Sequence, residues 1–255
     1  MIDIKVFVIK SQNRSLDTAL LSFIHDNDLD MIESPGVFLQ SGSNLDSVVD
    51  FKECHLRIGR NITLSEIGIA LAHRQIYKRI IEEDYAWALV LEDDAFITNA
   101  NLFKEQIENS ICFSPDIPRV SLLFHHAKRL VDSQPNSTFK RSTITPSYAV
   151  AYVLNKSAAN ELLESQTPIT SVADWPLCTH KIDYWLSNSF AIMHGSETYH
   201  YNSYLDGMSR SPTNILDKWR WILGIDLIRF NRVSLKALHR HYCFVIKPRL
   251  SLSRS

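Results

Sequence analysis

Hydrophobic residues recur at helical spacing over residues 63–83 and then run without interruption over residues 86–91. The first pattern predicts an amphipathic helix, and Thr63 followed three residues later by Glu66 predicts a capping box at its start. The second run is short enough for a buried strand in a sheet that is covered on both faces. Residues 61–98 therefore predict a helix followed by a strand, around which the rest of the chain is interpreted.

Shorter patterns of the same two kinds alternate along the rest of the chain. The predicted strands are residues 4–9, 120–124, 147–154 and 190–193, and the predicted helices are residues 16–24, 103–112 and 155–163. Residues 26–55 and 127–143 are polar or contain Ser, Pro and Gly, so loops are expected there. Strands that alternate with helices, without internal repeats, predict a layered α/β domain.

Three consecutive acids, Glu92, Asp93 and Asp94, follow the central strand. Open α/β sheets bind ligands at the carboxyl ends of their strands. Neighbouring carboxylates repel one another unless a cation lies among them, and their oxygens are ligands suited to Mg²⁺ or Mn²⁺. In an extended segment Glu92 and Asp94 point the same way and Asp93 points the opposite way. A solvated acidic turn that caps the next helix accounts for these residues equally well.

Charge is distributed unevenly, although the formal net charge is only −1. Seven Lys or Arg and no acid follow Asp226, which leaves 20 basic and 28 acidic residues in positions 1–226. Interleaved with aliphatic residues, these cations predict a basic helical C-terminal tail, residues 227–255, that lies on the anionic inner face of a membrane. Nucleic-acid binding is a less favoured interpretation of this tail, because the segment lacks a motif that reads bases and an aromatic face that stacks on them. A plain solvated helix is the other interpretation.

Several classes of protein are disfavoured by what the sequence lacks. The four cysteines are scattered without a CxxC pair, which is typical of a reducing cytoplasm and not of a zinc site or disulfide scaffold. Asp3, Lys5 and Lys10 make the first ten residues unlike a secretory signal. No apolar run reaches the roughly 18 residues that a membrane-spanning helix needs. No GxGxxG or Walker pattern occurs, so a glycine-rich phosphate loop is not expected.

The central segment resembles the signature of glycosyltransferase family 25, which comprises bacterial lipooligosaccharide and lipopolysaccharide sugar transferases related to collagen galactosyltransferases. The family pattern runs G-E-I-G-C-x-x-S-H, then a helix, then an apolar strand that ends in E-D-D. The matching segments are Ser65-Glu-Ile-Gly68, Leu71-Ala-His73 and Ala88-Leu-Val-Leu-Glu-Asp-Asp94. Later segments, residues 147–163 and Val172-Ala-Asp174, are also similar to the family. The chain departs from the pattern at Ser65, Ile69 and Ala72.

The resemblance implies a GT-A-like, Rossmann-type nucleotide-binding sheet with helices on both faces, formed by residues 1–226. It implies a metal-dependent inverting transfer of a hexose, galactose or glucose, from a UDP-sugar to a lipooligosaccharide or other glycolipid or oligosaccharide acceptor. The expected cofactor is Mn²⁺ or Mg²⁺. The protein is then expected to be cytoplasmic, and peripheral on the inner face of the cytoplasmic membrane.

The resemblance also assigns roles to residues. The metal ligands are expected to be Asp94, Glu92 and His194, and the nucleotide sugar is expected to contact Arg14, Glu66, His73, Glu92 and Asp93. Besides Asp94, the catalytic residue is expected to be Asp174 as general base, with Asp183 as the alternate.

Each assignment has a plainer alternative: a surface charge for Arg14, a satisfied core side chain for His73, a surface residue for His194 and a helix cap for Asp174. For the whole protein, the main alternative is a catalytically inactive relative that binds nucleotide sugars. A metal-dependent phosphotransferase is less well supported, because no aspartyl nucleophile motif opens the chain.

Overall fold

The structure is a computed structural model that describes residues 2–11, 14–58, 60–124, 138–142, 149–173, 181–189 and 191–194. Its main element is a seven-stranded mixed sheet in the order β2-β1-β3-β7-β5-β8-β6. These strands are β1 (Lys5–Lys10), β2 (Met31–Pro35), β3 (Trp87–Glu92), β5 (Arg119–Leu122), β6 (Phe139–Ser142), β7 (Ala151–Asn155) and β8 (Asp183–Ser187). A separate two-stranded sheet pairs β4 (Ala95–Ile97) with β9 (Ile192–His194). The helices are α1 (Thr18–Asp26), α2 (Phe51–Ile58), α3 (Leu64–Glu82), α4 (Ala100–Ile111) and α5 (Lys156–Ser165).

Strand direction sets which strand ends share an edge of the sheet. β1 is parallel to β2 and to β3, so the carboxyl ends of these three strands lie together. β7 runs antiparallel to both β3 and β5, and β8 is parallel to β5. β3, β5 and β8 therefore point in the same direction, and the start of β8 lies at the edge opposite to the carboxyl end of β3.

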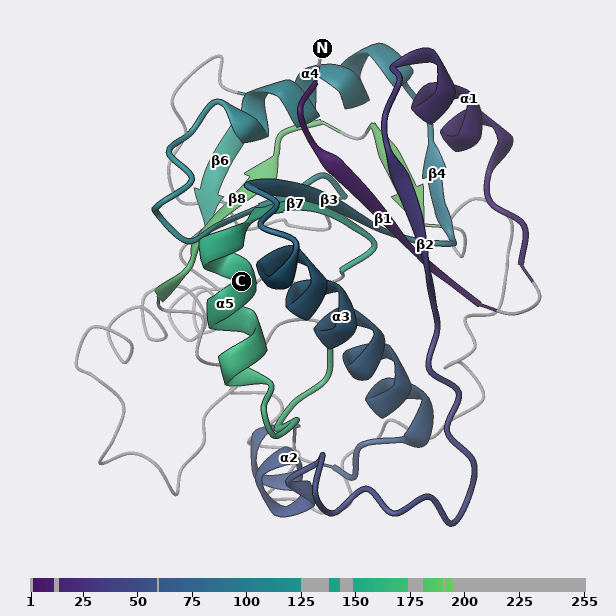
Figure 1. The fold of residues 1–255 in the computed structure, drawn as a ribbon, viewed down its shortest axis with the longest axis vertical. Helices are drawn as coiled ribbons and strands as arrows, with labels where there is room; N and C mark the ends of the chain where they lie inside the picture. The colour runs from purple at the N-terminus through teal and green to yellow at the C-terminus, as the bar shows by residue number, and fades with distance from the viewer. Residues whose placement is uncertain are drawn as a thin grey trace, which may run out of the picture.

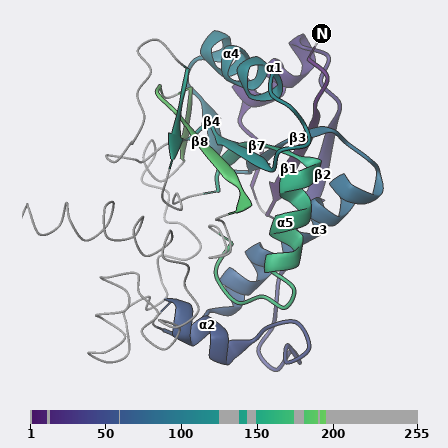
Figure 2. The same ribbon diagram turned by 90° about the vertical axis from the view of Figure 1, so that its left-hand side faces the viewer.

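Helices cover both faces of the main sheet (Figures 1 and 2): α1 and α4 lie on one face, α3 and α5 on the other. Alternate residues of β3 enter two separate cores, with Leu89 and Leu91 facing α1 and α4, and Ala88 and Val90 facing α3 and α5. A third, smaller cluster joins α2 to the start of α3. The expected α/β class with helices on both faces is confirmed.

The capping box that the sequence predicts at the start of α3 is present. Thr63 Oγ1 accepts from the Glu66 backbone N–H at 3.3 Å, and Glu66 Oε2 accepts from the Thr63 backbone N–H at 3.0 Å. Two residues further on, Gly68 lies under the chain at Val37, where an added Cβ would be 2.1 Å from the Val37 carbonyl oxygen. Any larger residue at position 68 would push this loop away from α3.

Three elements form where the sequence pattern predicts loops: β2 and the first part of α2 within residues 26–55, and β6 within residues 127–143. β2 is an edge strand with mostly part-buried or exposed residues, so it shows no clear alternation of hydrophobic and polar positions. β6 is the opposite edge strand and carries Lys140 and Arg141, as edge strands commonly do. No described helix has both the length and the apolar composition to cross a membrane. The proposed tail, residues 227–255, lies outside the described residues.

Candidate active site at the carboxyl end of β3

Asp93 is fixed to the loop that follows β1. β1 and β3 are parallel neighbours with Ile9 opposite Glu92, so the residues that follow each strand meet at one edge of the sheet. The backbone N–H of Ser11 donates to Asp93 Oδ2 at 2.6 Å, and the Ser11 hydroxyl donates to the same oxygen. The Asp93 side chain is only 9% exposed. Its orientation is therefore set by the loop that follows β1 and not by solvent.

Arg14 bridges the two aspartates. Its Nη1 lies 3.1 Å from Asp93 Oδ1 and 3.1 Å from Asp94 Oδ2. The repulsion that the sequence predicts between adjacent acids is thus partly offset by a cation from the β1–α1 loop. Two carboxylates and one guanidinium leave this cluster with a negative balance, which a second cation would neutralise.

His194 reaches Asp94 through the small sheet. In the pairing of β4 with β9, Ala95 lies opposite His194, which places His194 Nε2 3.2 Å from Asp94 Oδ2. Both side chains are 14% exposed. The structure therefore brings together two of the residues that the sequence proposes as metal ligands, although a hundred positions separate them in the chain.

Asp94 has the electrostatic character of a ligand. Burial by itself would raise the pKa of Asp94, but the hydrogen bond and charge of His194, together with Arg14, outweigh burial and lower the pKa below its ordinary value. The carboxylate is therefore ionised at neutral pH. Its Oδ1 is buried and has no hydrogen-bond partner among the described residues. A buried carboxylate oxygen without a partner is costly unless something binds it.

Glu92 turns away from this pair. Its Oε1 lies 3.4 Å from His73 Nε2 on α3, on the other face of the sheet. The sequence pattern places Glu92 and Asp94 on the same side, and the structure separates them because β3 ends at Glu92 and a turn follows. Glu92 is therefore not beside the candidate metal ligands Asp94 and His194.

His73 connects α3 to the sheet through a buried chain of hydrogen bonds. His73 Nδ1 is 2.8 Å from the Tyr152 hydroxyl on β7, which is 3.1 Å from the Tyr77 hydroxyl. Burial raises the pKa of both tyrosines, so both hydroxyls stay protonated at neutral pH. The chain fixes the His73 ring beside Glu92. Tyr152 and Ser11 were not predicted, and the sequence signal for Tyr152 is a tyrosine inside a mainly aliphatic strand.

Glu66 is engaged at the start of α3. Arg60 Nη2 and Nη1 donate to its two oxygens at 2.6 and 2.8 Å, and Thr63 completes the capping box. Burial would raise the pKa of Glu66, but the hydrogen bonds and charge of Arg60 and the bonds from Thr63 lower it. Both oxygens of Glu66 are therefore committed to Arg60 and to the helix cap.

Asp174, the proposed general base, lies outside the described residues. The alternate, Asp183, lies at the opposite end of the strands, level with the start of β3. It begins β8 opposite Arg119, and the register through β7 puts this row level with Trp87, at the start of β3. The length of β3 from Trp87 to Glu92 is about 16 Å. Asp183 therefore does not face Asp93 and Asp94, and the structure argues against it as the base.

The two residues Asp94 and His194 fit a divalent cation that also binds phosphate. Within the part of the chain that the structure describes, no three His, Cys, Asp or Glu side chains are grouped to hold a metal ion by themselves. Mg²⁺, however, is commonly held by one or two protein ligands, with water and substrate phosphates in the remaining positions. The ionised Asp94, whose Oδ1 has no hydrogen bond to any described residue, and the adjacent imidazole of His194 meet this requirement.

A hollow of about 250 Å³ opens beside this pair. It is lined by Asp94, by Phe96 of β4 and by residues 14–18, which lead into α1. The carboxyl end of β3 thus offers space for a ligand next to an ionised carboxylate, an imidazole and a guanidinium.

Comparison with known proteins finds a family whose model covers the end of β3. A model of glycosyltransferase family 25 (LPS biosynthesis protein) matches residues 39–177, more than half of the chain, and includes α3, β3 and the three acids. This match confirms the resemblance seen in the sequence. A search of curated proteins finds no match.

Solved structures show only weak likeness. A glycosyltransferase involved in the glycosylation of the major capsid of PBCV-1 is similar with a TM-score of 0.34 and 12% identity, over 63% of this chain and 64% of the other. A mannose-1-phosphate geranyltransferase from Thermus thermophilus is similar with a TM-score of 0.37 and 10% identity, over 73% of this chain and 74% of the other. Likeness at this level carries no argument about activity.

Proposed function

The chain belongs to glycosyltransferase family 25, and from this premise we propose that it transfers a hexose, galactose or glucose, from a UDP-sugar to a lipooligosaccharide or other surface-glycan acceptor. The observation that carries the proposal is Asp94. It is ionised, has one buried oxygen without a hydrogen-bond partner among the described residues, and lines a hollow at the carboxyl end of β3 beside Arg14 and His194. This is the edge where open α/β sheets bind nucleotides.

The chemical problem is the leaving group. When the bond between the sugar and the diphosphate breaks, negative charge builds up on the diphosphate oxygens. A divalent cation, Mn²⁺ or Mg²⁺, held by Asp94 and His194 would supply Lewis-acid stabilisation of that charge. Arg14 adds a fixed guanidinium in the same place, and Asp93, clamped by Ser11, holds Arg14 in position. The chain thus aims positive charge where the reaction generates negative charge.

Inversion at the anomeric carbon in one displacement needs a base on the side opposite the leaving group, to accept the proton of the acceptor hydroxyl. We assign this role to Asp174, which follows the described loop that ends at Ala173. Glu92, held beside His73, is proposed to contact the donor sugar from the α3 side of the sheet. At the end of β3, residues on one face of the sheet then contact the leaving group, and Glu92 on the other face contacts the sugar.

Hydrolysis of UDP-galactose and UDP-glucose by the purified chain, with and without Mn²⁺, tests the proposal directly. Turnover that depends on Mn²⁺ and is lost in Asp94→Asn is the expected result. Binding without turnover would identify the inactive nucleotide-sugar-binding relative instead. In a thermal denaturation assay, the correct donor at a hundredfold excess over its dissociation constant is expected to add about 2.7 kcal/mol to the free energy of unfolding.

Membrane association is a separate part of the proposal. The seven basic residues after Asp226, with no acid among them, suit a segment that binds the anionic inner face of the cytoplasmic membrane, where a glycolipid acceptor would lie. Deleting residues 227–255 is expected to move the protein from the membrane fraction to the supernatant. Unchanged sedimentation would rule out this tail as the attachment.

A further inference from the structure

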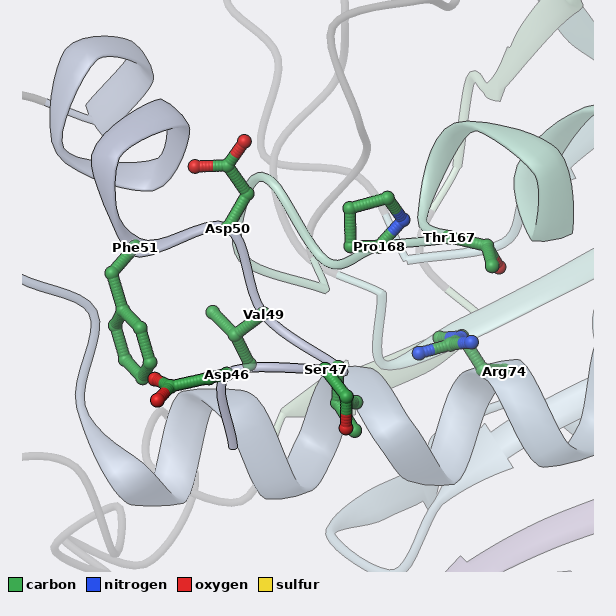
Figure 3. Close-up of a pocket in the computed structure, with 9 residues that line it drawn as sticks. Asp46, Ser47, Val49, Asp50, Phe51, Arg74, Thr167 and Pro168 are labelled. Carbon is green, nitrogen blue, oxygen red and sulfur yellow. The ribbon is translucent and has the colours of Figure 1, made fainter. Parts of the chain in front are cut away.

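A second and larger cleft lies away from Asp94, along the side of α3. It has a volume of about 560 Å³, within the range typical of small-molecule sites. Its walls come from the segment that leads into α2, from the middle of α3 and from the chain just after α5 (Figure 3). None of the residues that line it takes part in the site at the end of β3.

Arg74 is the unusual residue of this cleft. It projects from α3 into the space bordered by Ser47, Thr167 and Pro168 (Figure 3). Its Nε is buried without a hydrogen-bond partner, and among the described residues no hydrogen bond or ion pair reaches the side chain. Burial lowers the pKa of Arg74, yet a guanidinium remains charged at neutral pH. A part-buried cation without a counter-ion favours binding of an anion.

Other arginines close to or on the same helix differ from Arg74. Arg60 is paired with Glu66 at 2.6 Å, and Arg79 is paired with Glu83 one turn further along α3. These two neighbouring cations are therefore paired with carboxylates, while no carboxylate of the described residues lies within ion-pair distance of Arg74.

The remaining lining is suited to a sugar. Ser47 offers a hydroxyl and Asp46 a carboxylate that can accept hydrogen bonds from sugar hydroxyls. Thr167 donates its hydroxyl to the Leu163 carbonyl oxygen, and Asp50 Oδ1 accepts from the Glu53 backbone N–H, so these two side chains offer only their remaining acceptor capacity. Phe51, 43% exposed, presents an aromatic ring against which a sugar face can pack. Asp46 and Asp50, which lie on the other side of the cleft from Arg74 (Figure 3), disfavour a polyanion such as a nucleoside diphosphate. They suit a ligand with many hydroxyls and a single acidic group.

The cleft is linked to the proposed active site by α3. Arg74 directly follows His73, whose Nε2 lies 3.4 Å from Glu92 Oε1 at the end of β3. Neighbouring residues of a helix are only about 1.5 Å apart along its axis. Their side chains point about 100° apart, so a saccharide anchored at Arg74 lies on a different face of α3 from His73, beside the same helix.

We infer that this cleft is an acceptor subsite that takes a sugar residue carrying one phosphate or carboxylate group, paired with Arg74. That the bound sugar belongs to the acceptor rests on the proposed glycosyl transfer. Binding of an acidic sugar is inferred from the cleft alone. Its consequence is selectivity: acceptors that carry this acidic sugar bind, and neutral acceptors of the same size bind weakly.

The test is binding to the full chain, measured by ligand-observed NMR or calorimetry. Glucose 6-phosphate and glucuronate represent the two acidic groups, with glucose and inorganic phosphate as separate probes. At least one acidic sugar is expected to bind about tenfold or more tightly than glucose and than phosphate. Which of the two binds identifies the acidic group. Equal binding of inorganic phosphate and the acidic sugars would overturn the sugar subsite, and equal binding of glucose would overturn the anion site.

Arg74→Gln is expected to weaken binding of the acidic sugar about tenfold or more, and Arg79→Gln, which removes a paired arginine from the same helix, is expected to leave it unchanged. Unchanged binding in Arg74→Gln would overturn the inference. Ser47→Trp provides a second variant that fills the cleft without altering its charge and is expected to abolish binding. Wild-type hydrolysis of UDP-hexoses is measured in parallel: its absence, with Arg74-dependent binding intact, would overturn the proposed transfer and leave the binding site.

Discussion

Two aspartates of this protein contact arginines at opposite ends of the strands of one sheet, but the rest of their contacts differ. Asp94 follows the carboxyl end of β3, with Oδ2 3.1 Å from Arg14 and 3.2 Å from His194. Its Oδ1 is buried and has no hydrogen bond within the described residues. The cluster is therefore incomplete by itself, and a ligand that binds Oδ1 would complete it.

Asp183 at the start of β8 is fully engaged. One oxygen accepts from Arg141 Nε of β6 at 2.9 Å, and the other is 3.5 Å from Arg119 Nη2 of β5. It therefore joins three neighbouring strands. The comparison shows that an aspartate beside arginine is not in itself a site. What distinguishes Asp94 is its position after the carboxyl end of β3 and its Oδ1, which has no hydrogen-bond partner in the part of the chain that the structure describes.

The largest expected effect follows from removing the charge of Asp94. Asp94→Asn keeps the shape of the side chain but weakens its attraction for a cation. We expect the turnover of UDP-hexose to fall by about 100-fold or more, with little change in thermal stability. Steady-state kinetics with Mn²⁺ and a melting curve measure the two quantities. Native turnover in this variant would contradict the assignment of Asp94.

The same substitution at the other edge is expected to act on stability instead. Asp183→Asn leaves the buried Arg119 without its carboxylate partner and should lower the free energy of unfolding by about 2 kcal/mol. Turnover of the folded fraction is expected to stay close to wild type. Urea denaturation and kinetics check this, and a loss of turnover as large as in Asp94→Asn would erase the distinction between the two aspartates.

Removing the histidine at the carboxyl edge has a smaller expected effect. His194→Ala leaves Asp94 in place but removes one proposed ligand, so the Mn²⁺ concentration for half-maximal activity should rise by about tenfold. A Mn²⁺ titration of activity measures this. His25→Ala, whose side chain is 89% exposed, is the matched control and should leave the titration unchanged. An unchanged titration for His194→Ala would exclude it as a ligand.

The smallest effect is expected at the third acid–arginine pair, Arg60 with Glu66. Glu66→Gln should cost about 1–2 kcal/mol at pH 7 through weaker bonds to Arg60 and Thr63. Because the folded-state pKa of Glu66 is lowered, its contribution is present above the unfolded pKa of about 4.3 and is lost as pH falls through the folded pKa. Urea denaturation at pH 7 and near pH 3 measures the free energy of unfolding of wild type and variant, and the difference between them is expected to be smaller near pH 3.

Glu82→Gln is the control for this pH series. Glu82 lies at the end of the same helix, with a side chain 61% exposed and 3.5 Å from Lys78. Its substitution is expected to change stability by less than about 0.5 kcal/mol at either pH. If wild type and Glu66→Gln differ in free energy of unfolding by the same amount at pH 7 and at pH 3, the lowered pKa of Glu66 is contradicted.

Features set by local chemistry were predictable from the sequence. The capping box of α3 needs only Thr63 and Glu66 three residues apart, and the buried strand β3 needs only an unbroken apolar run. Asn155 likewise caps α5, at the start of the helix predicted over residues 155–163. Elements at the margins of the fold were missed: β2 and β6 are edge strands with polar residues, and β4 has only three residues. Their pairing partners, and not their own composition, make them strands.

The sequence by itself determined that this chain has a capped helix, a buried strand and three acids in succession, because these depend on neighbours within a few residues. Only the tertiary structure decided what each acid does. The turn after β3 sends Glu92 to His73 on one face, and the pairing of β4 with β9 brings His194 to Asp94. Contacts between residues a hundred positions apart depend on strand order and register, which no local pattern encodes.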